Sequence, residues 1–72
     1  MMDWQRIMIL LRKYYRPISD ISMTLGHNPC WGGKLMNGIT KAPKRDDAKR
    51  LCKMVMEFVP ELEWPVDIQE YL

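Results

Sequence analysis

Apolar residues recur at three- and four-residue steps along most of the chain, which is the spacing of one face of a helix. The first series predicts a helix from Asp3 to Tyr15, with Asp3 as its N-cap and Pro17 beyond its end. Its expected inward residues are Trp4, Ile7, Leu11 and Tyr14. Three cations near its end either compensate the helix dipole or contact phosphate, and both interpretations stay open: Arg12, Lys13 and Arg16.

The next segment predicts a short second helix from Ile18 to Leu25, followed by a tight turn. Ser22 is its small inward residue, which would let a crossing helix come close. Gly26 stands where a left-handed conformation closes the helix, a conformation that a side chain would resist.

A third helix is predicted from Pro29 to Asn37, with Pro29 in the first position, where no amide is needed. Asn28 offers its side-chain oxygen to the free amides of this helix, and Leu35 is the expected core anchor. Gly32 and Gly33 are unusual there, since each costs about 0.8–1.0 kcal/mol relative to Ala. The pair therefore indicates a place where another helix or a DNA backbone comes close.

A basic loop from Thr40 to Arg45 precedes a fourth predicted helix, which Asp46 and Asp47 open and Pro60 ends. Its expected inward face is Ala48, Leu51, Cys52, Val55 and Val59. Three further apolar residues widen that face and suggest burial on a second side: Met54, Met56 and Phe58.

The C-terminal segment, residues 60–72, allows two interpretations. It is either a short helix opening at Pro65 or an extended strand in which Val66 and Ile68 alternate with polar residues. A segment this apolar is expected to fold back on the core or to pair with a second copy of the chain.

With 72 residues the chain supports one small domain, spanning residues 1–72. The contents of 47% hydrophobic and 28% charged residues are those of a globular protein and argue against wholesale disorder. No apolar run reaches the length of about 18 residues that a membrane span needs, and the N-terminal residues do not resemble a signal peptide. A cytoplasmic location, in a bacterial cell or a phage-infected host, and no membrane partner are therefore expected.

The two cysteines, Cys30 and Cys52, do not form a metal-type Cys-x-x-Cys pair. We expect both to be free thiols, with Cys52 in the core and Cys30 near the surface. His27 has no ligand neighbours at zinc spacing and is interpreted as a turn residue or a phosphate contact. The sequence thus predicts no catalytic residue, no metal site, no cofactor and no enzymatic activity.

Charge is distributed unevenly along the chain. Residues 1–53 hold eleven cations and four acids, a net charge of +7, whereas residues 54–72 hold five acids and no cation, a net charge of −5. This asymmetry favours a basic working surface followed by an acidic closing segment. The alternative is a solvated surface with uneven charge.

The block LGHNPCWGGKLMNGI, with Ile21 and Ser22 before it, resembles the helix-turn-helix of lambda-type phage repressors and Cro proteins. The closest match is the run from Gly33 to Ile39, in which a core Leu is followed by Asn-Gly-Ile at the helix exit. The basic loop and the fourth helix fit the same pattern. The resemblance covers roughly residues 17–59, and Gly32 stands where relatives carry a branched apolar residue.

The resemblance implies a compact all-α domain of four or five helices, with the helix-turn-helix at about residues 18–38. It implies binding of double-stranded operator DNA, usually by a homodimer, and regulation of phage or bacterial promoters. The segment 60–72 is a candidate for the dimer contact. In the family the first residues of the recognition helix contact base edges, and the matching residues here are Pro29, Cys30 and Trp31.

Two functions are compatible with this pattern. The first is a sequence-specific DNA-binding regulator, a repressor or a Cro-like protein, in which lysines bind phosphates and the third helix contacts bases. Its expected DNA-binding residues are Asn28, Cys30, Trp31, Gly33, Lys34, Asn37, Thr40, Lys41 and Lys44. The second is a small phage-encoded inhibitor or antirepressor on the same scaffold, which binds a host or phage protein through Trp31 as a buried anchor.

Overall fold

The computed structural model describes residues 2–71, and these residues form four α-helices and two short 3-10 helices without any strand. The α-helices are α1 (Trp4–Tyr14), α2 (Ile18–Thr24), α3 (Trp31–Met36) and α4 (Arg45–Phe58), and the 3-10 helices are η1 (Glu61–Glu63) and η2 (Val66–Tyr71). The whole measures 29 × 22 × 19 Å. The expected all-α class is confirmed for the described residues.

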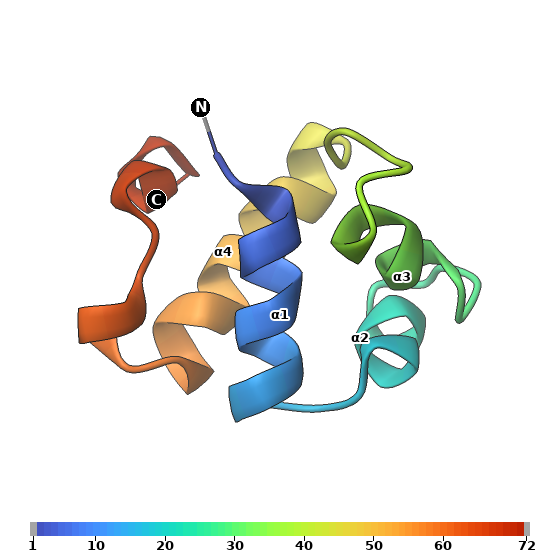
Figure 1. Ribbon diagram of the computed structural model, residues 1–72, viewed down its shortest axis with the longest axis horizontal. Helices are drawn as coiled ribbons and strands as arrows, with labels where there is room; N and C mark the ends of the chain where they lie inside the picture. The colour runs from blue at the N-terminus through green and yellow to red at the C-terminus, as the bar shows by residue number, and fades with distance from the viewer. Residues whose placement is uncertain (1, 72) are drawn as a thin grey trace.

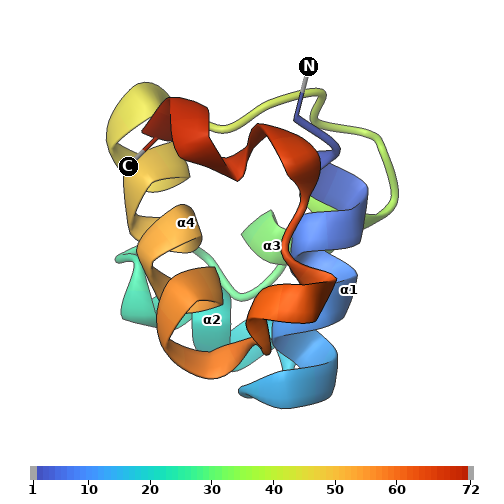
Figure 2. The same cartoon turned by 90° about the vertical axis from the view of Figure 1, so that its left-hand side faces the viewer.

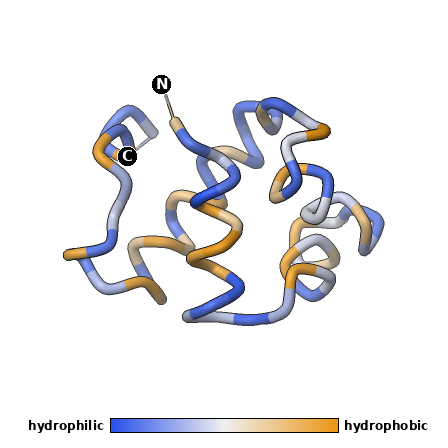
Figure 3. The backbone as a smooth tube through the Cα atoms, viewed as in Figure 1, coloured by the Kyte–Doolittle hydropathy of each residue, from blue (hydrophilic) through white to orange (hydrophobic). Residues whose placement is uncertain are grey.

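Helix α1 lies in the middle of the molecule, with α2 and α3 on one side of it, and α4 crosses behind it from upper right to lower left (Figure 1). The most hydrophobic turns of α1 and α4 lie side by side around the core (Figure 3). The side chains without solvent exposure include one or more from each α-helix: Ile7, Met8, Leu11, Ile21, Leu35, Leu51, Cys52 and Val55. All five residues expected on the inward face of α4 are buried, which confirms that part of the pattern.

The residues after α4 fold back across the face made by α1 and α4 (Figure 2). Ile68 is buried in the core, and the Tyr71 ring packs edge-on against Trp4 with ring centroids 5.3 Å apart. The indole N–H of Trp64 donates to the Val59 carbonyl at 2.9 Å. Of the two interpretations, the short helix is therefore correct in outline, as a 3-10 helix, and the strand is wrong.

This C-terminal segment and the α2–α3 pair lie at opposite ends of the molecule's long axis (Figure 1). Its acidic residues are accordingly far from Lys34 on α3, and it leaves the outer side of α3 uncovered. Among the described residues, no helix has the length and apolar character needed to cross a bilayer.

Each of the four α-helices differs from its predicted bounds by one or two residues, and the largest difference is at the start of α3. Helix α3 begins at Trp31 instead of Pro29, because the Asn28 side-chain oxygen accepts from the Cys30 amide at 2.9 Å and the Asn28 carbonyl accepts from the Trp31 amide at 2.9 Å. These bonds place Pro29 in a turn. Helix α4 begins one residue earlier than expected, at Arg45.

Candidate functional site

The turn after α2 has the geometry that the sequence indicated. Gly26 has a φ of +80°, and its amide donates to the Met23 carbonyl at 2.9 Å. The next amide, of His27, donates to the Ser22 carbonyl at 2.9 Å. This pair of bonds is the Schellman motif, which satisfies the last carbonyls of a helix and requires a left-handed residue. The chain therefore reverses sharply here and returns as α3 across α2.

Ser22 and Gly32 lie where α2 and α3 cross. The Ser22 hydroxyl donates to the Ile18 carbonyl at 2.9 Å and accepts from the Gly32 amide at 2.8 Å. A Cβ atom on Gly32 would lie 2.7 Å from both the Ile18 Cγ2 atom and the Ser22 Oγ atom. Gly32 is therefore required by helix packing, and for this glycine the expected close approach is that of another helix, α2.

Gly33 has a different environment from its neighbour. A Cβ atom built on Gly33 meets nothing within 4 Å, and its backbone is helical with no positive φ. No contact in the described fold requires a glycine here. The structure thus divides the glycine pair into one packing residue, Gly32, and one residue whose missing side chain leaves bare backbone at the surface.

His27 links the turn to α4 and to α3. Its Nε2 atom lies 2.8 Å from the Asp47 Oδ2 atom, and Asp47 is only 8% exposed. The His27 ring also stacks on the Trp31 ring, with centroids 4.3 Å apart and planes 7° from parallel. Trp31 is consequently half-buried as part of this cluster. His27 is a turn residue with a structural partner, and one face of the Trp31 ring is covered by it.

Two long-range contacts that the sequence analysis missed hold the ends of α2 and α3. Arg50 donates to the Thr24 carbonyl at 3.2 Å and to the Leu25 carbonyl at 3.4 Å, where α2 ends. Gln5 donates to the Met36 carbonyl at 3.4 Å, where α3 ends. These partners are 25 to 31 residues apart in the chain, so no local pattern indicates them.

Small and polar residues occupy the outer side of α3 and the turn before it. Cys30, Lys34 and Asn37 are exposed and Gly33 is partly exposed, which places four of the expected DNA-binding residues on one surface. Asn28 is also exposed, although its side-chain oxygen is engaged by the Cys30 amide. We call the surface formed by residues 28, 30, 33, 34 and 37 the α3 surface.

The remaining expected residues lie in the loop between α3 and α4. Thr40 is partly buried, and its amide shares the Lys34 carbonyl with the Ile39 amide. Thr40 and Lys41 line a cavity of about 280 Å³ next to the start of α1, so this part of the loop turns toward α1. Lys44 is exposed at the N-cap of α4.

Three of the expected phosphate-binding residues have free charges: Lys34, Lys41 and Lys44 are exposed and form no ion pair with any residue from 2 to 71. By contrast, Arg6 pairs with Glu63 at 3.7 Å. Unpaired lysines can bind an anionic partner without first breaking an internal contact.

The chemistry of the described residues includes two free thiols, one exposed at Cys30 and one buried at Cys52. Both positions agree with the expectation. Desolvation by burial raises the pKa of the Cys52 thiol to about 11. The described part of the chain contains no group of three or more His, Cys, Asp or Glu side chains that could hold a metal ion.

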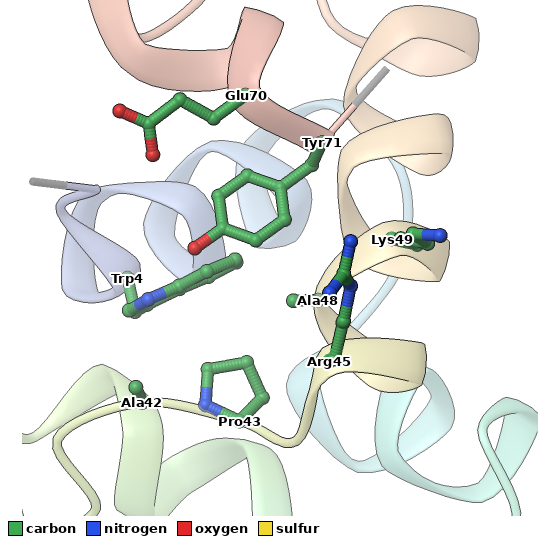
Figure 4. A pocket seen from close by; sticks show the side chains of 8 residues that line it. All are labelled: Trp4, Ala42, Pro43, Arg45, Ala48, Lys49, Glu70 and Tyr71. Atoms are coloured by element: carbon green, nitrogen blue, oxygen red, sulfur yellow. The ribbon is translucent and has the colours of Figure 1, made fainter.

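A cavity of about 410 Å³ lies at the start of α4 (Figure 4). Trp4 and Tyr71 line one side of it, and Arg45 and Lys49 of α4 line the other. It is separate from the α3 surface and contains no arrangement of nucleophile and base.

Comparison of the chain with protein-family models, with curated proteins and with solved structures finds no match in any of the three.

Proposed function

We propose that this protein is a sequence-specific DNA-binding regulator whose α2, turn and α3 form a helix-turn-helix of the lambda-repressor and Cro type. The observation that carries the proposal is the α3 surface: an exposed helix side with bare backbone at Gly33 and an unpaired lysine at position 34. A recognition helix of this kind lies in the major groove and contacts base edges.

Three features of the fold support this assignment. The turn at Gly26 and the close crossing of Ser22 with Gly32 fix α3 firmly against α2. The His27–Asp47 contact fixes the same turn to α4. The acidic C-terminal segment lies at the other end of the molecule, so it leaves α3 open to a polyanion (Figure 1).

On this proposal, Lys34, Lys41 and Lys44 bind phosphates and set the position of the protein on the duplex. Asn37 lies beside Lys34 on the outer side of α3 and offers an amide to a phosphate or a base edge. Cys30 offers a small, weakly polar surface that suits contact with a thymine methyl group.

Selection of random DNA duplexes against the purified protein tests the proposal directly, and the expected result is an enriched half-site. Three phosphate contacts per copy predict a log–log slope of affinity against salt of about −2.7 for each copy bound. Lys34→Gln should weaken binding to all sequences. Lys13→Gln at the end of α1 removes the same charge, and an unchanged affinity would assign Lys13 to the helix dipole, whereas a weaker one would assign it to a phosphate contact. No enriched sequence, or an affinity independent of salt, would refute the proposal.

The protein-binding alternative depends on Trp31 as an anchor. Because Trp31 already stacks on His27 and is half-buried, it offers less free surface than that alternative needs. Loss of activity in Trp31→Ala together with full activity in a Lys34→Glu, Lys41→Glu variant would favour the alternative over DNA binding.

A further inference from the structure

The side of α4 that faces η2 carries a row of unpaired cations. Arg45, Lys49 and Lys53 are four residues apart, so they share one side of the helix. All three are exposed, and none forms an ion pair with a residue that the structure describes. They form a second basic patch, on α4, away from the α3 surface.

A groove runs along these cations. The cavity of Figure 4 and a second one of about 420 Å³ share Lys49 and Tyr71 as lining residues. The second cavity is also lined by Lys53 and by Met56, which is largely exposed for an apolar side chain. We call this feature the α4–η2 groove; its rim carries these three cations and one acid, Glu70, and its floor is apolar and aromatic.

The neighbouring C-terminal segment carries acids in place of cations, and two exposed apolar side chains lie beside them. Leu62 is 100% exposed and Val66 is 94% exposed, the two highest values among the large apolar residues of the described chain. Leu62 stands between Glu61 and Glu63. Both side chains are almost fully in water beside carboxylates, so they add little apolar burial within a single copy.

We propose that a second copy of this chain binds here, with residues 61–66 of each copy occupying the α4–η2 groove of the other. Glu61, which forms no ion pair with the described residues, matches the cations of α4, and Leu62 and Val66 match the apolar floor. In Figure 2, α4 and η1 lie on opposite sides of one face. A two-fold axis through that face therefore brings η1 of each copy toward α4 of its partner, an isologous contact.

A dimer of standard size would bury a modest share of the exposed surface. A standard interface buries about 800 Å² on each partner, which is about a sixth of the 4752 Å² that this chain exposes. The dimer leaves both α3 surfaces free, and the inference does not depend on DNA binding.

The test is analytical ultracentrifugation of the full chain at low salt, without DNA. Wild-type protein should be dimeric at tens of micromolar. A groove variant, Lys49→Glu with Lys53→Glu, and a segment variant, Glu61→Lys, should each be monomeric. Mixed in equal amounts, the two variants should form a heterodimer. In it the acidic altered groove meets the cation introduced at position 61 of the altered segment, and the basic wild-type groove meets the acidic wild-type segment.

A control variant, Lys34→Glu with Lys41→Glu, changes the net charge as much as the groove variant and should remain dimeric. Leu62→Ser should raise the dimer dissociation constant by about tenfold or more, with an unchanged melting curve at concentrations where the protein is monomeric. Circular dichroism of each variant verifies that it is folded.

Wild-type protein that stays monomeric at these concentrations would overturn the inference. So would a dimer that persists in both the groove and the segment variants, or two folded monomeric variants whose mixture does not associate. Each of these results leaves the DNA proposal intact, since the duplex selection tests that separately.

Discussion

Replacing Gly33 by Ala gives a direct measure of why a glycine stands at this position of α3. The added methyl group meets no atom within 4 Å, and the backbone of Gly33 is helical. Ala is favoured over Gly in a helix interior by about 0.8–1.0 kcal/mol. Gly33→Ala should therefore stabilise the protein by roughly that amount, or raise its melting temperature by about 4–8 °C per kcal/mol.

The neighbouring substitution, Gly32→Ala, is the matched control, because it makes the same chemical change one residue earlier. Its methyl group would lie 2.7 Å from the Ile18 Cγ2 and Ser22 Oγ atoms, so the two helices must move apart. Overpacking of this kind costs about 1–3 kcal/mol. Two adjacent, chemically identical changes should thus have opposite signs in urea or thermal denaturation.

DNA affinity then separates the structural effect from the functional one. If the backbone of Gly33 lies against the groove, the methyl group of Gly33→Ala should weaken specific binding by about tenfold, equal to 1.4 kcal/mol, although the protein is more stable. Fluorescence anisotropy with the selected duplex at fixed salt measures this. If Gly33→Ala is stabilised and binds DNA as well as wild type, the Gly33 backbone does not lie close to the DNA. If Gly33→Ala is destabilised, the open space assigned to Gly33 in the unbound protein is wrong.

Further predictions concern the contacts that hold α2 and α3. Ser22→Ala leaves the buried Gly32 amide without its acceptor and should cost about 1–3 kcal/mol of unfolding free energy. Thr24→Ala removes only an exposed donor to the Asp20 carbonyl and should cost about 0.5 kcal/mol or less. Equal losses in urea denaturation would contradict the role given to Ser22. His27→Ala leaves the Asp47 carboxylate buried without its partner and should lower the unfolding free energy by about 1–3 kcal/mol, and an unchanged urea midpoint would show that this contact is unimportant. Burial raises the pKa of the Cys52 thiol from 9.0 to about 11, so as the pH rises the thiol ionises first in the unfolded chain. The free energy of unfolding should therefore keep its full Cys52 contribution below pH 9 and fall between pH 9 and 11. Cys52→Ala should show a shallower fall over this range, and an identical fall would refute Cys52 as its cause.

Much of the fold could be predicted from the sequence, because local chemistry determines it. The Asp3 side chain accepts from the Arg6 amide at 3.1 Å, as the N-cap assignment required. Gly26 has the expected left-handed conformation, and Leu35 is fully buried. Each of these can be inferred from residues within one or two helical turns, so the pattern contains the necessary information.

The features that the sequence did not indicate depend on where separate helices meet. Gly32 and Gly33 are indistinguishable as letters, and only the crossing with α2 assigns one to packing and leaves the other at the surface. The contacts of Gln5 with α3 and of Arg50 with α2 depend on the tertiary arrangement. For the same reason the half-burial of Trp31 on His27 could not be decided beforehand.

The brevity of α2 and α3 has a practical consequence. With seven and six residues, they are far below the length of about 12–15 residues at which an isolated helix becomes stable in water. A synthetic peptide of residues 18–38 should therefore be largely unstructured and a poor competitor of the intact domain. Anyone transplanting this surface to another scaffold would need to carry α1 and α4 along with it.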